Sequence, residues 1–435
     1  MRNPLTQEMI EQFRREFEND SHANSMHAAA ARTEIKDLVF LPMEAAKLNG
    51  AFSVEIKTRG ITAQEKSGRC WMFSVLNILR EKVAEKYHLN FFEFSENYLA
   101  FYDKLEKSNN LLEMTIENAS KPLSDRKMEY IIESFWDGGL WPMAVNLIEK
   151  YGLVPKSAMP ETYQSSHTEK FMRLLKTLLK KDMAELRKMI AEGKDPSKRK
   201  EEMMGEIFKA ECICFGMPPE TFHFEYRDKD GVYHSDRNLS PKEFYEKYVG
   251  TDLSQYVFLI NEPTDLKKFH TLYQYHKIGN MAEHDIRILN LPMDEIKELC
   301  IAQLKDGEPV FFGCDSGAYG DRTEGIWDID SFDYSGIFGG ADLFMNKKDR
   351  LELKDSYPSH NMILVGVNLD ENGKPDRWKI ENSWGKEAGK EGYFVCSDRY
   401  FEEYVYEAVI LKKYLSQRNI EALKKEPVLI EPWQI

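Results

Sequence analysis

The sequence has 435 residues, of which 42% are hydrophobic and 30% charged, and its formal net charge is −14. This length is enough for one large domain or two to three ordinary ones. The acidic balance argues against general nucleic-acid binding, because affinity for phosphates comes mainly from Lys and Arg. No run approaches the roughly 18 apolar residues that a membrane-spanning helix needs, and the charged N-terminus lacks the apolar core of a secretory signal. We therefore expect a cytoplasmic protein that does not bind membranes, with nucleic acid an improbable partner.

The six cysteines are few for this length and are scattered along the chain, which is not typical of a disulfide scaffold. Cys212 and Cys214 are separated by one residue, which is not the usual zinc spacing, and no second pair follows. We interpret these two as packing residues. The sequence therefore predicts reduced thiols, no metal ion and no organic cofactor.

The N-terminal residues 1–60 are expected to form an arm. Met9, Ile10, Phe13 and Phe17 follow a helical spacing within a charged stretch. Such a segment cannot form much of a core alone. We expect it to pack on the main domain or on a neighbouring subunit.

Residues 64–79 place a polar, glycine-containing turn directly before a dense apolar run. That density favours a buried helix over a surface strand, with Cys70 in its first turn. The N–H groups and dipole of a helix N-terminus stabilise a thiolate, so this is a suitable place for a nucleophile. The alternative is that Cys70 is an ordinary buried cysteine, the more common fate of cysteines among apolar residues.

The first half of the chain is expected to be mainly helical. Residues 64–161 are interrupted by loops at Pro122 and at 137–142, and residues 143–151 predict another partly buried helix. Residues 165–215 form a charge-rich helical insertion with one apolar side, which we interpret as a solvated insertion and not as a binding element.

After Pro218 and Pro219 the β-branched and aromatic density typical of strands begins. The predicted strands are residues 222–226, 256–260, 309–312, 360–367, 377–382 and 392–395. Helices followed by strands indicate an α+β protein with two lobes, with the last strands in an antiparallel sheet. Beyond Leu411 we expect charged helix and then an apolar tail.

A nucleophilic thiol needs a base, an orienting partner for that base, and donors for the oxyanion. His360 stands at the head of a predicted strand and could pair with Cys70 across a cleft, which would lower the pKa of the thiol. Asn382, at the end of the next strand, could fix the imidazole tautomer. Gln64 could donate to the oxyanion together with the Cys70 N–H, and Trp384 could cover the base from water.

Each of these residues also has an ordinary interpretation. The chain has ten histidines, and most histidines are surface or satisfied core residues. Asn-Ser before Trp-Gly is also a common turn sequence. The functional hypothesis therefore depends on the conjunction of all four residue types.

Several motifs together make the chain resemble the papain-like cysteine peptidases, and within them the bleomycin hydrolase and aminopeptidase C family. The motifs are Ser-Gly-Arg-Cys-Trp at 67–71, Asp-Gly-Gly at 137–139 with Trp141, residues 151–156 and 159–162, Gly-Cys-Asp at 313–315, and Glu-Asn-Ser-Trp-Gly at 381–385. The resemblance implies a two-lobe fold, with a helical left lobe and an antiparallel, β-barrel-like right lobe. It further implies a peptidase domain at 61–415, a C-terminal arm at 416–435 near the cleft, peptide substrates and a homohexamer.

The resemblance also assigns roles to individual residues. Cys70 corresponds to the nucleophile, His360 to the acid–base, Asn382 to its orienting residue and Gln64 to the oxyanion donor. The substrate-binding residues that it suggests are Gly138, Gly139, Trp71, Asn361, Trp384 and Ile435.

The chain departs from the papain-like peptidases that it resembles at several positions. Ser67 replaces a disulfide-forming cysteine of the secreted enzymes, in agreement with a reducing compartment. Asn361 replaces a common alanine after the histidine. The tail ends at Ile435, shorter than in the aminopeptidases, as in the bacterial endopeptidase branch. We therefore expect endopeptidase or mixed activity, with strict aminopeptidase activity as the alternative.

Acyl transfer by another Cys-His-Asn family and nucleic-acid binding are the competing functions.

Overall fold

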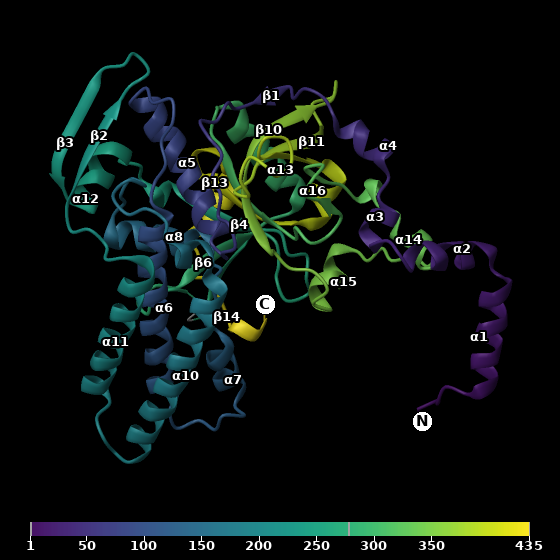
Figure 1. The fold of residues 1–435 in the computed structure, drawn as a ribbon, viewed down its shortest axis with the longest axis horizontal. Helices are drawn as coiled ribbons and strands as arrows, with labels where there is room; N and C mark the ends of the chain where they lie inside the picture. Colours follow the sequence, from purple (N-terminus) through teal and green to yellow (C-terminus); the bar gives the residue numbers. More distant parts are fainter. Residues whose placement is uncertain (1, 277–278, 435) are drawn as a thin grey trace.

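Helix α5 (Cys70–Lys86) lies between two lobes in the computed structural model, which describes residues 2–276 and 279–434 (Figure 1). It contacts helices α6 and α8 in one lobe and strands β7 and β10 in the other. Fourteen of its residues are buried. A helix that is apolar on nearly all sides is stable only inside a protein, and this explains why α5 occupies the centre.

The helical lobe packs around one face of α5. Its helices are α6 (Glu96–Glu117), α7 (Arg126–Glu133), α8 (Trp141–Tyr151), α9 (Tyr163–Ser166), α10 (Thr168–Ala191) and α11 (Ser197–Phe215). The last two form the long hairpin at the lower left of Figure 1. Leu175, Leu179 and Leu186 of α10 are buried, whereas Leu174 is exposed, so the apolar side of this predicted helix faces the lobe.

The second lobe is built on a sheet of twelve strands among the described residues, eleven of them in the order β14-β5-β6-β4-β13-β7-β10-β11-β12-β9-β8, with β1 added beside β10. The strands are β1 (Val54–Glu55), β4 (Tyr256–Ile260), β5 (Thr271–Tyr275), β6 (Ile286–Asn290), β7 (Val310–Cys314), β8 (Gly320–Asp321), β9 (Ile326–Trp327), β10 (His360–Leu369), β11 (Pro375–Glu381), β12 (Tyr393–Ser397), β13 (Val405–Leu411) and β14 (Val428–Ile430). A separate hairpin joins β2 (Phe222–Arg227) to β3 (Tyr233–Leu239).

Further helices flank the sheet and the hairpin. They are α12 (Pro241–Phe244), α13 (Met293–Lys305), α14 (Tyr334–Ile337), α15 (Lys347–Glu352), α16 (Asp398–Tyr404) and α17 (Gln417–Leu423). None of the helices in the described part of the chain combines the length and apolar character needed to cross a membrane.

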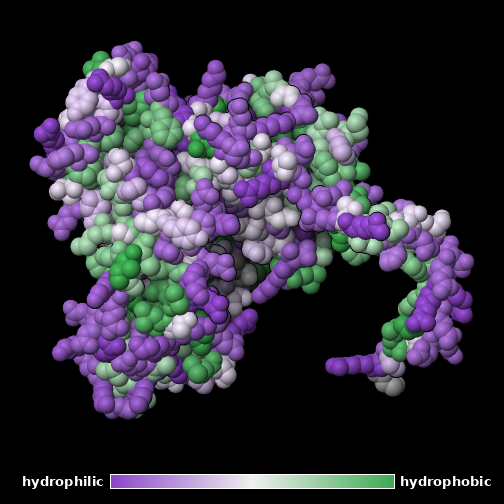
Figure 2. All heavy atoms as spheres, in the orientation of Figure 1, coloured by the Kyte–Doolittle hydropathy of each residue, from purple (hydrophilic) through white to green (hydrophobic). Residues whose placement is uncertain are grey.

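Residues 7–19 of the N-terminal arm extend away from both lobes (Figure 1), whereas residues 35–45 lie against the sheet lobe, in contact with α14 and with residues 329–331. The arm contains α1 (Gln7–Asn19), α2 (Ser21–Ala30), α3 (Ile35–Val39) and α4 (Pro42–Ala45). The predicted helix around Phe13 is confirmed as α1, but it has no buried residue. Figure 2 shows its apolar side chains grouped on one side of the arm.

The expected α+β class with two lobes is confirmed, and two details differ from expectation. The pairs β4/β6, β9/β12 and β5/β14 are parallel, whereas the centre of the sheet is antiparallel. The tail forms the strand β14, because Val428, Leu429 and Ile430 pair with the edge strand β5. Eight strands of the described residues were missed from the sequence: β1, β3, β5, β6, β8, β9, β13 and β14.

Candidate active site

Cys70 is the first residue of α5, as predicted, and only 8% of its surface is exposed. The N–H groups of a first helical turn have no partner within their own helix. The backbone N–H of Trp71 is close enough to the sulfur to favour its thiolate form. Cys70 therefore lies where a helix can stabilise negative charge.

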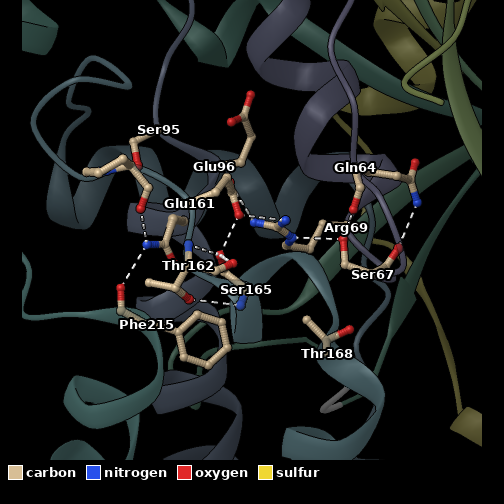
Figure 3. Close-up of polar contacts among 12 residues, drawn as sticks. Gln64, Ser67, Arg69, Ser95, Glu96, Glu161, Thr162, Ser165, Thr168 and Phe215 are labelled. Atoms are coloured by element: carbon tan, nitrogen blue, oxygen red, sulfur yellow. Dashed lines mark hydrogen bonds and ion pairs between the residues drawn. The ribbon is translucent and has the colours of Figure 1, made fainter. Parts of the chain in front are cut away.

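The loop before Cys70 is held by a buried ion pair (Figure 3). The Arg69 guanidinium donates to both carboxylate oxygens of Glu161 at 3.0 and 2.9 Å, and its Nε donates to Ser67 Oγ at 2.9 Å. The Arg69 side chain is 1% exposed. Burial opposes ionisation of Glu161, but the Arg69 charge outweighs it and lowers the pKa of Glu161. The fork-shaped contact fixes the residue next to Cys70 in one orientation.

Asp137 holds the same loop from a second direction. Its carboxylate accepts the Gly68 N–H at 2.7 Å and the Thr168 hydroxyl at 2.6 Å, and it pairs with Lys104 at 2.5 Å. Burial alone would raise the pKa of Asp137, but Lys104 and these donors hold it well below its usual range. A Cβ on Gly68 would lie 2.9 Å from the Asp137 Cβ. The close approach therefore requires glycine at this position.

Gln64 is fixed between the loop and the sheet lobe. Its Nε2 donates to the Ser67 carbonyl at 2.7 Å, and its Oε1 accepts the Ser383 hydroxyl at 2.7 Å. The Gln64 N–H also donates to the Ser383 carbonyl at 2.8 Å. Because a side-chain amide nitrogen carries two hydrogens, one N–H remains beyond the bond to Ser67.

The sheet register brings His360 and Asn382 together from positions 22 residues apart. His360 begins β10, and Asn382 follows the last residue of the antiparallel neighbour β11, whose Glu381 pairs with Ile363. His360 Nε2 lies 2.8 Å from Asn382 Oδ1. Because the amide oxygen also accepts the Ser383 N–H, Nε2 is the protonated nitrogen of the neutral ring. The other nitrogen, Nδ1, is then an acceptor.

Trp384 covers the imidazole, as expected from the sequence. The two rings are stacked with centroids 4.7 Å apart and an interplanar angle of 24°. Phe394 meets the indole edge-on at 5.5 Å. The base is therefore held by aromatic packing as well as by one hydrogen bond.

Burial has the largest effect on the pKa values of Cys70 and His360. It raises the pKa of the Cys70 thiol to about 11, although the N–H groups of Asn361 and Trp71 act in the opposite direction. It lowers the pKa of His360 to about 4 against the effect of Asn382. The expected lowering of the Cys70 pKa is therefore not found in this geometry. Desolvation of a single charge outweighs the helix N-terminus.

Asn361 links Cys70 to a buried carboxyl group that sequence reasoning missed. The Cys70 sulfur lies 4.0 Å from Asn361 Oδ1, and Asn361 Nδ2 donates to Glu407 at 2.9 Å. Burial raises the pKa of Glu407 to about 8. A signal was present in the sequence, because Glu407 is a lone acid in the apolar run 405–410.

The other residues predicted to bind substrate are Trp71, Gly138, Gly139 and Ile435. Trp71 is fully buried, and a Cβ on Gly139 would lie 2.5 Å from its ring. Its indole N–H approaches the Asp137 carbonyl at 3.4 Å, so Trp71 supports the glycine segment from within. Lys107 donates to the Gly138 carbonyl at 2.6 Å. Ile435 lies outside the described residues.

The arrangement combines a thiol at a helix N-terminus, an oriented imidazole and a fixed side-chain amide. Such a set can attack a carbonyl carbon, move a proton and bind an oxyanion. Sequence reasoning named these groups but missed the residues that hold them, namely Arg69, Glu161, Asp137 and Ser383. These four residues lie inside the sequence motifs named above, but no local pattern shows which residues they contact.

Comparison with known proteins agrees with this chemistry. Residues 4–435 match the model of the family described as "Peptidase C1-like family". The chain is 42% identical to an Aminopeptidase C of Listeria monocytogenes, covering 100% of this chain and 98% of the relative. An Aminopeptidase C of Streptococcus thermophilus is 42% identical, covering 88% and 87%. The crystal structure of PepW from Lactobacillus rhamnosis HN001 superposes with a TM-score of 0.96 at 39% identity, covering 100% of this chain and 99% of that one.

Proposed function

The chain belongs to the Peptidase C1-like family and is a papain-like cysteine peptidase, and we propose that it hydrolyses oligopeptides with Cys70 as the nucleophile. The observation that carries this proposal is the His360–Asn382 contact of 2.8 Å in the lobe opposite the N-terminus of α5. The contact leaves Nδ1 of the imidazole free to take a proton. A cysteine buried only for packing does not require an oriented base in the facing lobe.

In the proposed mechanism the Cys70 sulfur attacks the peptide carbonyl while its proton passes to His360 Nδ1. The oxyanion receives the Cys70 N–H and the remaining N–H of Gln64. His360 then gives the proton to the leaving nitrogen, and the acyl-thioester forms. Water, deprotonated by the same imidazole, releases the acyl group. No cofactor takes part in these steps.

Burial bears on the first proton transfer. Since burial favours the neutral forms of both Cys70 and His360, formation of the charged pair requires thiolate and imidazolium to stabilise each other. Opposite charges a few ångströms apart have this effect, and it is strongest where water is excluded. Trp384 supports this by shielding the ring.

Two modes of cleavage compete. The relatives named Aminopeptidase C, together with one named Aminopeptidase G, favour removal of N-terminal residues. The sequence-based expectation of endopeptidase or mixed activity stays a prediction. The comparison of kcat/KM for a peptide and its N-acetylated form separates them. A strong preference for the free amine supports the aminopeptidase, and equal rates support internal cleavage.

We further propose a cytoplasmic homohexamer with an arm at 1–60, a peptidase domain at 61–415 and a C-terminal arm at 416–435. The apolar side of α1, with Met9, Phe13 and Phe17 each 41–48% exposed, supports contact of the arm with another subunit. The six cysteines are free thiols, which supports a reducing compartment. Analytical ultracentrifugation of the intact chain tests the assembly.

The catalytic proposal is tested by Cys70→Ala. Turnover of a peptide substrate should fall to background, while the melting temperature and the oligomeric state stay unchanged. Cys300→Ala is a control, because it removes a buried thiol outside the site. Normal turnover by Cys70→Ala would show that another group performs the chemistry.

A further inference from the structure

A cavity of about 250 Å³ is lined by Trp384, the residue that stacks on the catalytic imidazole. The charge of Arg322, which also lines the cavity, acts on that imidazole. Lys36, Asp321, Arg322, Trp327 and Trp384 are among the residues that line it. The formal charge of these side chains is positive, although the whole chain carries −14. An anionic group is therefore favoured in this cavity over most of the surface.

Arg322 is the cation that is available in this cavity. Its guanidinium lies 5.1 Å from the centroid of the Trp384 ring. Within the described residues, its side chain has no carboxylate partner and no hydrogen bond. Lys36, by contrast, pairs with Asp321 at 3.2 Å. A guanidinium placed against an indole, with its N–H groups unused, is a suitable donor pair for a carboxylate.

The backbone that presents Arg322 is well fixed. The Arg322 carbonyl accepts the Gly389 N–H at 2.9 Å. The preceding Asp321 accepts the N–H groups of Thr323 and Glu324 at 2.8 and 2.9 Å, closing the turn between β8 and β9. The arginine is thus exposed at its tip but anchored at its base, which lowers the entropy cost of binding a ligand.

The position of the cavity indicates which part of a substrate would reach it. The acyl half of the substrate bonds to Cys70, whereas the leaving nitrogen must lie next to His360 to receive its proton. A leaving peptide that continues past the imidazole meets Trp384 and then Arg322. The contacts of 4.7 Å from His360 to the Trp384 ring and 5.1 Å from that ring to Arg322 together are at most about three extended residues long, at about 3.5 Å each. A carboxylate on the side chain or at the C-terminus of the first or second residue therefore comes within reach of the guanidinium.

We propose that Arg322 and the Trp384 cavity form a subsite for a carboxylate on the first or second residue after the cleaved bond. This rests on the proposed function, because it needs His360 to mark the leaving side. The carboxylate is either an acidic side chain or the C-terminus of a short peptide, and both present the same two oxygens to the guanidinium.

The test uses peptides that share one acyl half and differ only after the cleaved bond. Glu-amide against Gln-amide measures a side-chain carboxylate, and Gln with a free C-terminus against Gln-amide measures a terminal one. The wild-type enzyme should prefer the carboxylate in at least one pair by roughly three- to tenfold in kcat/KM, the range expected of a partly exposed but two-pronged ion pair. The responding pair identifies the source of the carboxylate.

Arg322→Gln should bring that ratio close to one, and Arg322→Lys should leave an intermediate ratio because it keeps the charge but not the fork. Ratios taken within one variant cancel any change that the substitution makes to His360. Arg418→Gln, which removes an exposed cation outside the cavity, should match the wild type. A wild-type ratio near one in both pairs, or a ratio that survives Arg322→Gln, overturns the subsite.

Failure of the subsite and failure of the proposed function are distinguishable. The neutral Gln-amide substrate reports hydrolysis without any carboxylate. Its cleavage by Cys70→Ala would contradict the proposed function, whereas a loss of the carboxylate ratio alone leaves that function intact.

Discussion

On the helical side of the site, ion pairs hold the loop before Cys70, whereas on the sheet side backbone register and aromatic packing hold His360. Arg69 and Glu161 meet as a buried fork, and Asp137 accepts the Gly68 N–H. His360 instead begins a strand paired on both sides and stacks on Trp384. A loop has no ladder of backbone bonds, so charged side chains must fix it, while a strand inside a sheet is fixed by the strands on both sides of it.

The difference predicts where each side is vulnerable. Removing one charge from the loop leaves its partner buried and unpaired, which costs stability. Removing a side chain from the sheet side leaves the strands in place, and the effect should fall on chemistry. Four substitutions test this contrast, from the largest expected effect to the smallest.

His360→Gln should lower kcat by about 10⁴-fold or more, since it removes the proposed general acid and base. The same change should shift the pH at which Cys70 reacts with iodoacetamide upward toward about 11, the value to which burial raises the pKa of the thiol. Mass spectrometry of the Cys70 peptide measures the rate, and the partly exposed Cys212 is an internal control. An unchanged pH profile for Cys70 would contradict the proposed pair.

Glu161→Gln should lower the free energy of unfolding by about 3–5 kcal/mol, because it leaves the Arg69 guanidinium buried without a charged partner. Denaturant unfolding measures the loss. Glu133→Gln is a matched control, since Glu133 pairs with Lys180 on the surface of the same lobe and 68% of its side chain is exposed. That change should cost at most about 1 kcal/mol. Equal losses of unfolding free energy in the two variants would show that the buried Arg69–Glu161 pair stabilises the fold no more than an exposed pair does.

Asn382→Ala should reduce kcat by roughly ten- to hundredfold with little change in unfolding, less than the loss of the acid–base itself. The ring would keep its stacking on Trp384 but lose the acceptor that selects its tautomer. Steady-state kinetics and thermal unfolding on one preparation test both parts. Asn372→Ala, in the exposed turn after β10, should change neither. If Asn382→Ala lost as much stability as Glu161→Gln, the helical and sheet sides would not differ in how their side chains affect folding.

Glu407→Gln tests an ionisable side chain that is buried on the sheet side. Burial raises the pKa of Glu407 from 4.5 to about 8, so the folded protein holds the proton more tightly than the unfolded chain. The resulting stability is fully present at low pH and is lost as the pH rises from about 4.5 toward 8. Glutamine cannot ionise, so the melting temperature of the wild type should fall relative to this variant between about pH 5 and 8.

The exposed Glu426 provides the control for that series, because Glu426→Gln should shift the curve equally at every pH. A parallel pH dependence for the wild type and Glu407→Gln would mean that Glu407 ionises like an exposed acid. Ionisation of Glu407 would then not destabilise the sheet side.

Much of this architecture could be predicted from local pattern. The apolar density after Cys70 predicted a buried helix, and the apolar strands containing His360 and Trp378 predicted their place in a sheet. The strand β13 was missed because its partners, β4 and β7, lie in distant segments of the chain. The same is true of β14, whose three residues form a strand only beside β5.

The sequence by itself determined the chemical groups: a thiol at a helix start, an imidazole, an amide that orients it and a second amide beside the thiol. These follow from residue type and from spacing along one segment. Tertiary structure alone decided how the groups are held and charged. The fork between Arg69 and Glu161, the burial that raises the pKa of Cys70 and the position of Arg322 beside Trp384 join residues far apart in the chain. Desolvation and ion pairing depend on distance in space, and local sequence patterns do not record that distance.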